Sequence, residues 1–147
     1  MIYTKLTKKA LRICFDAHKD QVDKTGMPYV FHPIHLAESM KDEYTTVLAL
    51  LHDVVEDTDR TIDDLRAEGF PDEVLEALSL LTHDPAVDYM DYVREIGKNQ
   101  LARAVKIADL RHNSDLSRMD ESMIDEHVLG RCEKYKKALK LLGAEES

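Results

Sequence analysis

The sequence predicts an all-α protein. Apolar residues recur at intervals of three and four rather than two, and glycines and prolines divide the 147 residues into helix-sized segments. No stretch shows the alternating pattern of a half-buried strand. A chain of this length can bury roughly two-thirds of its unfolded surface in one core. We therefore expect a single domain over residues 1–147.

The first three predicted helices lie in the N-terminal half of the chain. Residues 6–17 carry an apolar stripe that forms one face of the first helix. Pro33 suits the first position of the second helix, whose apolar residues extend to Met40. Residues 44–55 are apolar on nearly every side, so we expect the third helix to be central and buried.

Shorter helices are expected in the remainder of the chain. Thr61 and Asp64 have the spacing of a capping box at the start of a short helix that ends near Gly69. The apolar stripes that follow predict four more helices, over residues 71–81, 89–96, 101–108 and about 122–142. The long last helix offers an apolar stripe that could bury a homodimer contact.

Charge and composition exclude several classes of protein. Twenty Lys and Arg face 29 Asp and Glu, a net charge of −9 with histidines neutral. Such an acidic chain lacks the basic surface needed for nucleic acid or for a membrane, so we expect neither as a partner. The start has no apolar leader segment, and the longest aliphatic run, residues 47–51, is too short to span a bilayer. Cys14 and Cys132 suggest no disulfide framework, and we expect a cytoplasmic protein.

The predicted central helix ends in a group of ionisable residues. Its apolar face runs on into His52, and Asp53, Glu56 and Asp57 follow within five residues. Negative charge near a helix C-terminus is disfavoured by roughly 0.3–1 kcal/mol per group, so the two last acids need a reason to be there. One reason is a functional site, and the other is simply an exposed last turn that leads into the next element.

Asp109 occupies a core position in the predicted helix over residues 101–108 and beyond. A buried carboxylate is costly unless a cation or metal compensates it. A buried salt bridge with Arg or Lys is one interpretation, and Lys106 lies one turn before it. Asn113 lies one turn beyond Asp109 on the same face.

His32, directly before Pro33, alone would suggest only an ordinary core or surface histidine. Together, His32, His52, Asp53 and Asp109 offer two imidazoles and two carboxylates from three helices, enough for one divalent cation. Because no thiolate is included, Mn²⁺ or Fe²⁺ fits at least as well as Zn²⁺. The other histidines are interpreted as surface or core fillers: His18, His35, His83, His112 and His127.

Three motifs in order resemble the hydrolase domain of the RelA/SpoT family. The matching segments are Ala17–Gln21 with Lys24–Pro33, then His52–Thr58, then Val105–Asn113. The resemblance extends over about residues 5–140 and implies an HD-domain helical bundle. The chain is too short to carry the family's synthetase domain as well. It therefore resembles the stand-alone small alarmone hydrolases, which include a metazoan SpoT homologue.

The resemblance implies a hydrolase that binds one Mn²⁺ and removes pyrophosphate from the 3′ position of ppGpp or pppGpp, giving GDP or GTP. It assigns the metal to His32, His52, Asp53 and Asp109. It assigns the activation of water to Glu56 and Asp57, and contacts with the nucleotide to Lys24, Thr25 and Asn113.

One departure from the family keeps a second hypothesis open. Asp23-Lys24 stands where the alarmone hydrolases commonly have Arg-Lys. An Arg side chain can stack on a purine, whereas an Asp cannot and repels phosphate. The second hypothesis is therefore an HD phosphohydrolase of another nucleotide, such as an adenine alarmone or NADPH. A third is a nucleotide-sensing module that binds without turnover.

Overall fold

A computed structural model describes residues 1–144, and within them every regular element is helical, as predicted. The α-helices are α1 (Lys5–His18), α2 (Phe31–Glu38), α3 (Glu43–Leu51), α4 (Val54–Asp57), α5 (Ile62–Ala67), α6 (Asp72–Leu81), α7 (Tyr89–Gly97), α8 (Gln100–Asn113) and α9 (Glu126–Leu141). Two 3₁₀ turns, η1 (Leu116–Arg118) and η2 (Glu121–Met123), join α8 to α9.

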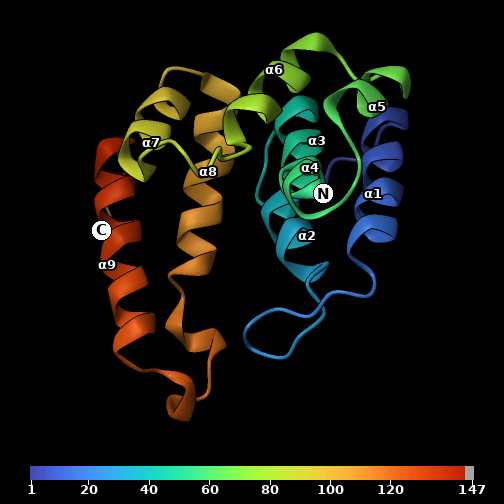
Figure 1. Ribbon diagram of the computed structural model, residues 1–147. Coiled ribbons are helices and arrows are strands. Elements are labelled where there is room, and N and C mark those ends of the chain that lie inside the picture. The colour runs from blue at the N-terminus through green and yellow to red at the C-terminus, as the bar shows by residue number, and fades with distance from the viewer. Residues whose placement is uncertain (145–147) are drawn as a thin grey trace.

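The central helix is α3, as the sequence predicts. All residues from 45 to 51 are buried, and α3 packs against α1, α2, α6 and α8. Figure 1 shows α1, α2 and α3 on one side of the molecule and α7, α8 and α9 on the other. The contact between α3 and α8 joins the two groups, and α6 packs on both of these helices. The site described below lies along this junction.

Side-chain caps define the beginnings of several helices. The Thr61 hydroxyl accepts a hydrogen bond from the backbone N–H of Asp64, and the Asp64 carboxylate accepts one from the N–H of Thr61. The predicted capping box is thus confirmed. Thr4 and Thr7 form an equivalent box before α1, and Asp42 caps α3. Each such cap is typically worth about 1 kcal/mol.

Two helix starts differ from the prediction. Helix α2 begins at Phe31, so Pro33 is its third residue rather than its first, and His32 is helical. Proline is tolerated there because the first-turn N–H groups have no partner inside a helix. The last helix begins at Glu126, about four residues later than expected, because the Asp125 side chain caps it there.

The prediction of one continuous helix over residues 44–55 was wrong. Helix α3 ends at Leu51 and α4 begins at Val54, with His52 and Asp53 between them. Asp53 has φ −107° and ψ 0°, outside the regular helical region. It stands at the N-cap of α4, yet its carboxylate makes no capping hydrogen bond and is directed to the site instead.

Two further observations bear on the sequence analysis. No helix within residues 1–144 is both long enough and apolar enough to cross a membrane. Cys14 and Cys132 are both buried as free thiols. Burial, followed by the charge of Asp53, raises the pKa of Cys14 to about 12, which leaves this thiol unreactive.

Candidate active site

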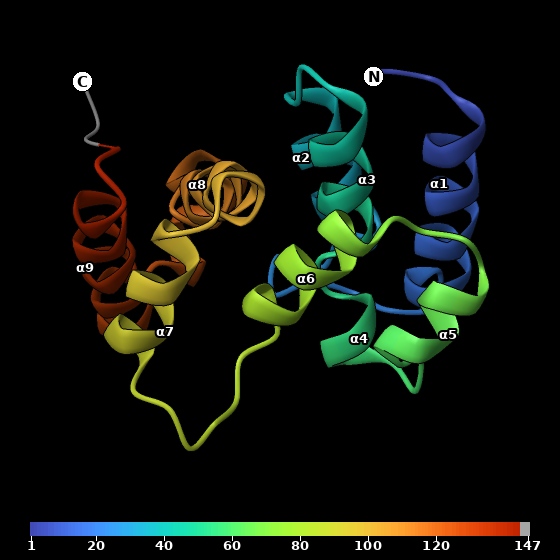
Figure 2. The same ribbon diagram turned by 90° about the horizontal axis from the view of Figure 1, so that it is seen from above.

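Three of the four predicted metal ligands meet in the interior. His32 comes from α2, His52 from the junction of α3 and α4, and Asp109 from α8. One ligand atom from each lies within 4.8 Å of the others, and all three residues are buried. Figure 2 shows from above how α2 and α3 stand beside α8, which brings these segments together although they are far apart in sequence.

The two nitrogens of His52 face different surroundings. Nδ1 lies 2.7 Å from the carbonyl oxygen of Ala49, which can only accept, so the proton is on Nδ1. Nε2 therefore presents a lone pair, and it is buried without a hydrogen-bond partner. Asp53 Oδ2 lies 2.9 Å and Asp109 Oδ1 3.6 Å from this nitrogen. The lone pair of His52 Nε2 and the two carboxylate oxygens would repel one another unless a positive charge lay between them. A divalent cation fits this requirement.

The pKa of His52 leads to the same conclusion. Burial alone would lower it, but the facing carboxylates of Asp53 and Asp109 raise it well above the usual value. The buried pocket thus favours positive charge at the end of this imidazole. A bound metal ion satisfies that preference as well as a proton does.

The two carboxylate oxygens of Asp109 have different partners: one forms a salt bridge, and the other faces the metal cluster, the group formed by His32, His52 and Asp109. Oδ2 accepts from Lys106 Nζ at 3.0 Å, while Oδ1 lies 2.9 Å from His32 Nε2 and accepts from Asn113 Nδ2 at 3.0 Å. Burial would raise the pKa of Asp109, but Lys106 and the two histidines hold it well below its usual range. Both sequence interpretations, the buried salt bridge and membership of the polar cluster, therefore describe this residue.

Asp53, the fourth predicted ligand, lies beside the cluster. Its Oδ2 accepts a hydrogen bond from the Tyr29 hydroxyl and lies 2.9 Å from His52 Nε2. Burial would raise the pKa of Asp53, but His52 outweighs that effect and lowers it. Sequence reasoning missed Tyr29, because an aromatic residue before an apolar helix usually indicates only core packing. The available signal was its position three residues before His32.

The two predicted catalytic acids lie on the short helix α4 and are exposed. Glu56 Oε1 accepts a hydrogen bond from the backbone N–H of His83 at 3.2 Å. Partial burial raises the pKa of both Glu56 and Asp57, and the charge of Asp53 raises it further. Carboxyl groups with raised pKa values are suited to proton transfer near neutral pH.

Glu56 and the metal cluster share a small cavity. His52, Asp53, Glu56, Lys106 and Asp109 line it together with three largely apolar neighbours. Its volume is about 20 Å³, enough for about one water molecule. The structure thus places an acid of α4, three predicted ligands and a largely buried lysine around a space of the size that a single reacting water needs.

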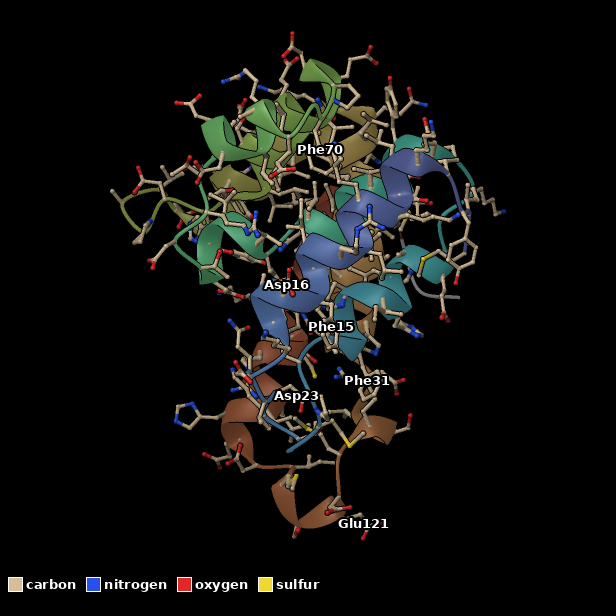
Figure 3. The ribbon with its side chains drawn as sticks, turned by 90° about the vertical axis from the view of Figure 1, so that its right-hand side faces the viewer. Phe15, Asp16, Asp23, Phe31, Phe70 and Glu121 are labelled. Atoms are coloured by element: carbon tan, nitrogen blue, oxygen red, sulfur yellow. The ribbon has the colours of Figure 1, made fainter. Side chains whose placement is uncertain are left out.

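The loop between α1 and α2 is organised by Asp23. Its Oδ1 accepts hydrogen bonds from the Thr25 N–H at 2.8 Å, the Thr25 hydroxyl at 2.6 Å and the Met27 N–H at 3.1 Å. Its Oδ2 lies 3.3 Å from Arg118 on η1. Figure 3 shows Asp23 on this loop, below Phe15 and Phe31 and beside the segment that joins α8 to α9.

The other predicted nucleotide contacts have different surroundings. Lys24 is exposed on the loop, whereas the Thr25 hydroxyl donates to Asp23. The Asn113 side chain donates to Asp109, so it touches the predicted metal cluster directly. Nucleotide binding by these three residues remains a prediction.

His112, interpreted from the sequence as a filler, lies against the predicted ligand His32. Its Nδ1 lies 2.6 Å from His32 Nδ1, and the two rings are nearly parallel and meet edge to edge, with centroids 4.9 Å apart. The signal in the sequence was its position on α8, three residues after Asp109, since residues three apart share a helix face. Burial, His32 and then Arg118 and His35 lower the pKa of His112 to about 4.

Comparisons with known proteins agree with the motifs. The chain is 35% identical over 86 residues to the guanosine-3′,5′-bis(diphosphate) 3′-pyrophosphohydrolase of Aquifex aeolicus, covering 56% of this chain and 12% of that protein. It is 42% identical over 65 residues to the bifunctional (p)ppGpp synthase/hydrolase SpoT of Escherichia coli, covering 42% of this chain and 9% of that one. The chain thus matches only a small part of these curated relatives. No protein-family model matches it.

A solved structure extends the likeness to the whole fold. It is described as a metazoan orthologue of SpoT that hydrolyses ppGpp. The two structures superpose with a TM-score of 0.71 at 26% sequence identity, covering 97% of this chain and 85% of the other. The predicted HD-type helical fold is therefore confirmed. In sequence and in fold, this chain is similar to SpoT-type proteins.

Proposed function

We propose that this chain is a metal-dependent phosphohydrolase that removes the 3′ pyrophosphate of ppGpp or pppGpp. The single observation that carries the proposal is the small cavity shared by the metal cluster and Glu56. The names of the relatives, which are 3′-pyrophosphohydrolases of ppGpp, supply the substrate.

In this proposal His32, His52, Asp53 and Asp109 hold one divalent cation. The cation supplies Lewis-acid polarisation of a phosphoryl oxygen and makes bound water more acidic. Nitrogen and carboxylate donors without a thiolate suit Mn²⁺, with Fe²⁺ and Zn²⁺ as alternatives. Lys106 neutralises the outer oxygen of Asp109 at 3.0 Å, so the ligand set is less negative than its carboxylates alone would make it.

Glu56 and Asp57 act on the attacking water. Glu56 lines the cavity and is held by the His83 N–H, so its carboxylate can orient a water there and take its proton. Asp57, on the same short helix and also with a raised pKa, assists as a second proton acceptor. Lys24, Thr25 and Asn113 contact the nucleotide, which is a small-molecule substrate.

The test uses the purified chain loaded with Mn²⁺ and incubated with ppGpp, with products separated by ion-exchange chromatography. The expected products are GDP and pyrophosphate, formed with Mn²⁺ and absent with a chelator. A Glu56→Gln protein treated in parallel should bind Mn²⁺ and leave ppGpp intact. Intact ppGpp beside a fully loaded wild-type protein would overturn the proposal.

A second candidate uses the same site on another nucleotide, such as an adenine alarmone or NADPH. The observation that favours it is Asp23, whose carboxylate occupies the loop assigned to the nucleotide. A substrate panel under the same conditions separates the two candidates, because each predicts a different best substrate by kcat/KM.

A further inference from the structure

Each nitrogen of the His32 imidazole has one close polar neighbour. Nε2 lies 2.9 Å from Asp109 Oδ1, inside the metal cluster, and Nδ1 lies 2.6 Å from His112 Nδ1. Two nitrogens at this distance share one hydrogen, so one ring donates and the other accepts. Which of them donates decides whether Nε2 of His32 carries a proton or a lone pair.

A metal ligand needs the lone pair on Nε2, and that requires the proton on Nδ1 of His32. The neighbour that can accept this proton in a hydrogen bond is His112. Histidine ligands almost always donate their other N–H to a carboxylate, a carbonyl or water. In this protein an imidazole stands at that position.

The ring of His112 is held in place from both sides. Its plane lies within 12° of the His32 ring, which it meets edge to edge through the two Nδ1 atoms, and its face stacks on His35 with centroids 4.1 Å apart and an angle of 22°. Its backbone carbonyl accepts a hydrogen bond from Arg118 at 2.9 Å. The acceptor nitrogen is therefore fixed in direction by His35 and Arg118, which lie outside the group of predicted metal ligands.

We propose that His112 is a positioning residue for the metal site, whose Nδ1 accepts a hydrogen bond from His32 Nδ1 and so fixes the tautomer that binds the cation. This inference rests on the proposed function only in requiring that the cluster bind a divalent cation. Loss of such a partner typically lowers metal affinity 10–100-fold. His112 belongs to α8, as Asp109 does, so this helix supplies both a predicted ligand and the group that orients another.

The test compares three variants of the full chain by calorimetric titration with Mn²⁺. His112→Phe keeps a flat ring for stacking and removes the acceptor, so the dissociation constant should rise 10–100-fold. His112→Asn keeps an oxygen near the position of Nδ1 and should restore most of the affinity. The matched control, His35→Phe, keeps the stack and has no group at the cluster, so its affinity should equal that of the wild type.

A spectroscopic readout separates the tautomer from a general effect on the fold. Long-range ¹H–¹⁵N correlation spectra of the Zn²⁺-loaded protein should show the His32 proton on Nδ1 and the His112 proton on Nε2. The inference is overturned if His112→Phe binds Mn²⁺ as tightly as the wild type, or if His32 Nδ1 carries no proton. Thermal melts of the three variants identify any that are unfolded.

The outcomes also distinguish this inference from the proposed function. If the affinities follow the expected order but no variant or wild-type protein hydrolyses ppGpp, the role of His112 stands and the proposed substrate is wrong. If the wild type binds no divalent cation, both proposals are wrong.

Discussion

The carboxylates of the buried cluster and those of the short helix α4 lie in opposite environments. Asp109 lies on a 14-residue helix, is buried, and receives hydrogen bonds or close contacts on both oxygens. Glu56 and Asp57 lie on a four-residue helix and are exposed. The first arrangement suits the fixed geometry that a metal ion needs, and the second suits groups that exchange protons with water.

The same contrast appears in the pKa values. Asp109 is held as a carboxylate because Lys106 and the histidines overcome the effect of burial. The pKa values of Glu56 and Asp57 rise because partial burial and the negative charge of Asp53 act in the same direction. The neighbouring charges thus keep Asp109 ionised and favour the protonated forms of Glu56 and Asp57.

The largest expected effect is that of Asp109→Ala. It removes a ligand and leaves Lys106 buried without its partner, a change that typically costs about 3–5 kcal/mol of stability. We expect loss of Mn²⁺ binding by calorimetry, loss of turnover, and a lower Tm. Asp109→Asn, which keeps the shape, should also lose metal binding but less stability. Full turnover in the Ala protein would contradict the proposed site.

The second effect is that of Glu56→Gln. Turnover should fall about 10²–10⁴-fold, the usual contribution of a general base, because the amide cannot take a proton. Mn²⁺ affinity should be unchanged, since Glu56 lies outside the group of three donor atoms. Glu73→Gln, an exposed residue on α6, serves as the control and should match the wild type. Loss of Mn²⁺ binding by the Glu56→Gln protein would contradict the separation of the proposed base from the metal-binding residues.

The third effect is the pH dependence of the reaction. Because the pKa values of Glu56 and Asp57 are raised, kcat should fall with decreasing pH at a midpoint above the ordinary carboxyl range of about 4. The folding stability depends on pH in the opposite direction. A raised folded-state pKa means that folding favours the protonated form, so this contribution is lost as pH rises. Glu56→Gln should therefore raise Tm slightly at pH 7, and a lower Tm would contradict the raised pKa.

The smallest effect is that of Asp23→Asn. It weakens a partly exposed ion pair with Arg118, an interaction typically worth about 0.2–1 kcal/mol, so KM should rise only a few-fold. The kcat value should stay unchanged, because Asp23 contacts loop groups and Arg118 rather than the cluster. Asp20→Asn, exposed on the same loop, is the control. A fall in kcat at constant KM would instead place Asp23 in the reaction.

Helical periodicity could predict the parts of the site that lie on one helix face. Lys106 lies three residues before Asp109 and Asn113 lies four residues after it, and both side chains donate a hydrogen bond to the Asp109 carboxylate. The burial of His52 followed from its register with the apolar face of the predicted central helix. These features depend on the spacing of residues within one helix, which can be read directly from the sequence.

The remainder depends on how separate helices approach one another. Tyr29 and His112 acquire their roles only because α2 lies against α3 and α8. No glycine or proline lies at the break between α3 and α4, at His52 and Asp53, so the sequence does not predict it. It follows from tertiary contacts, since the carboxylate of Asp53 binds Tyr29 rather than capping α4.

That break has a consequence for how such a protein can change. In a continuous helix each residue is rotated by about 100° from the last, so an insertion would turn every later side chain together. Here α4 takes a new direction after Asp53, so the orientation of Glu56 and Asp57 is not tied to the helical phase of α3, whose C-terminus is capped by His52. The acids proposed to act on water and the donors proposed to hold the cation therefore lie on two segments whose orientations can change separately.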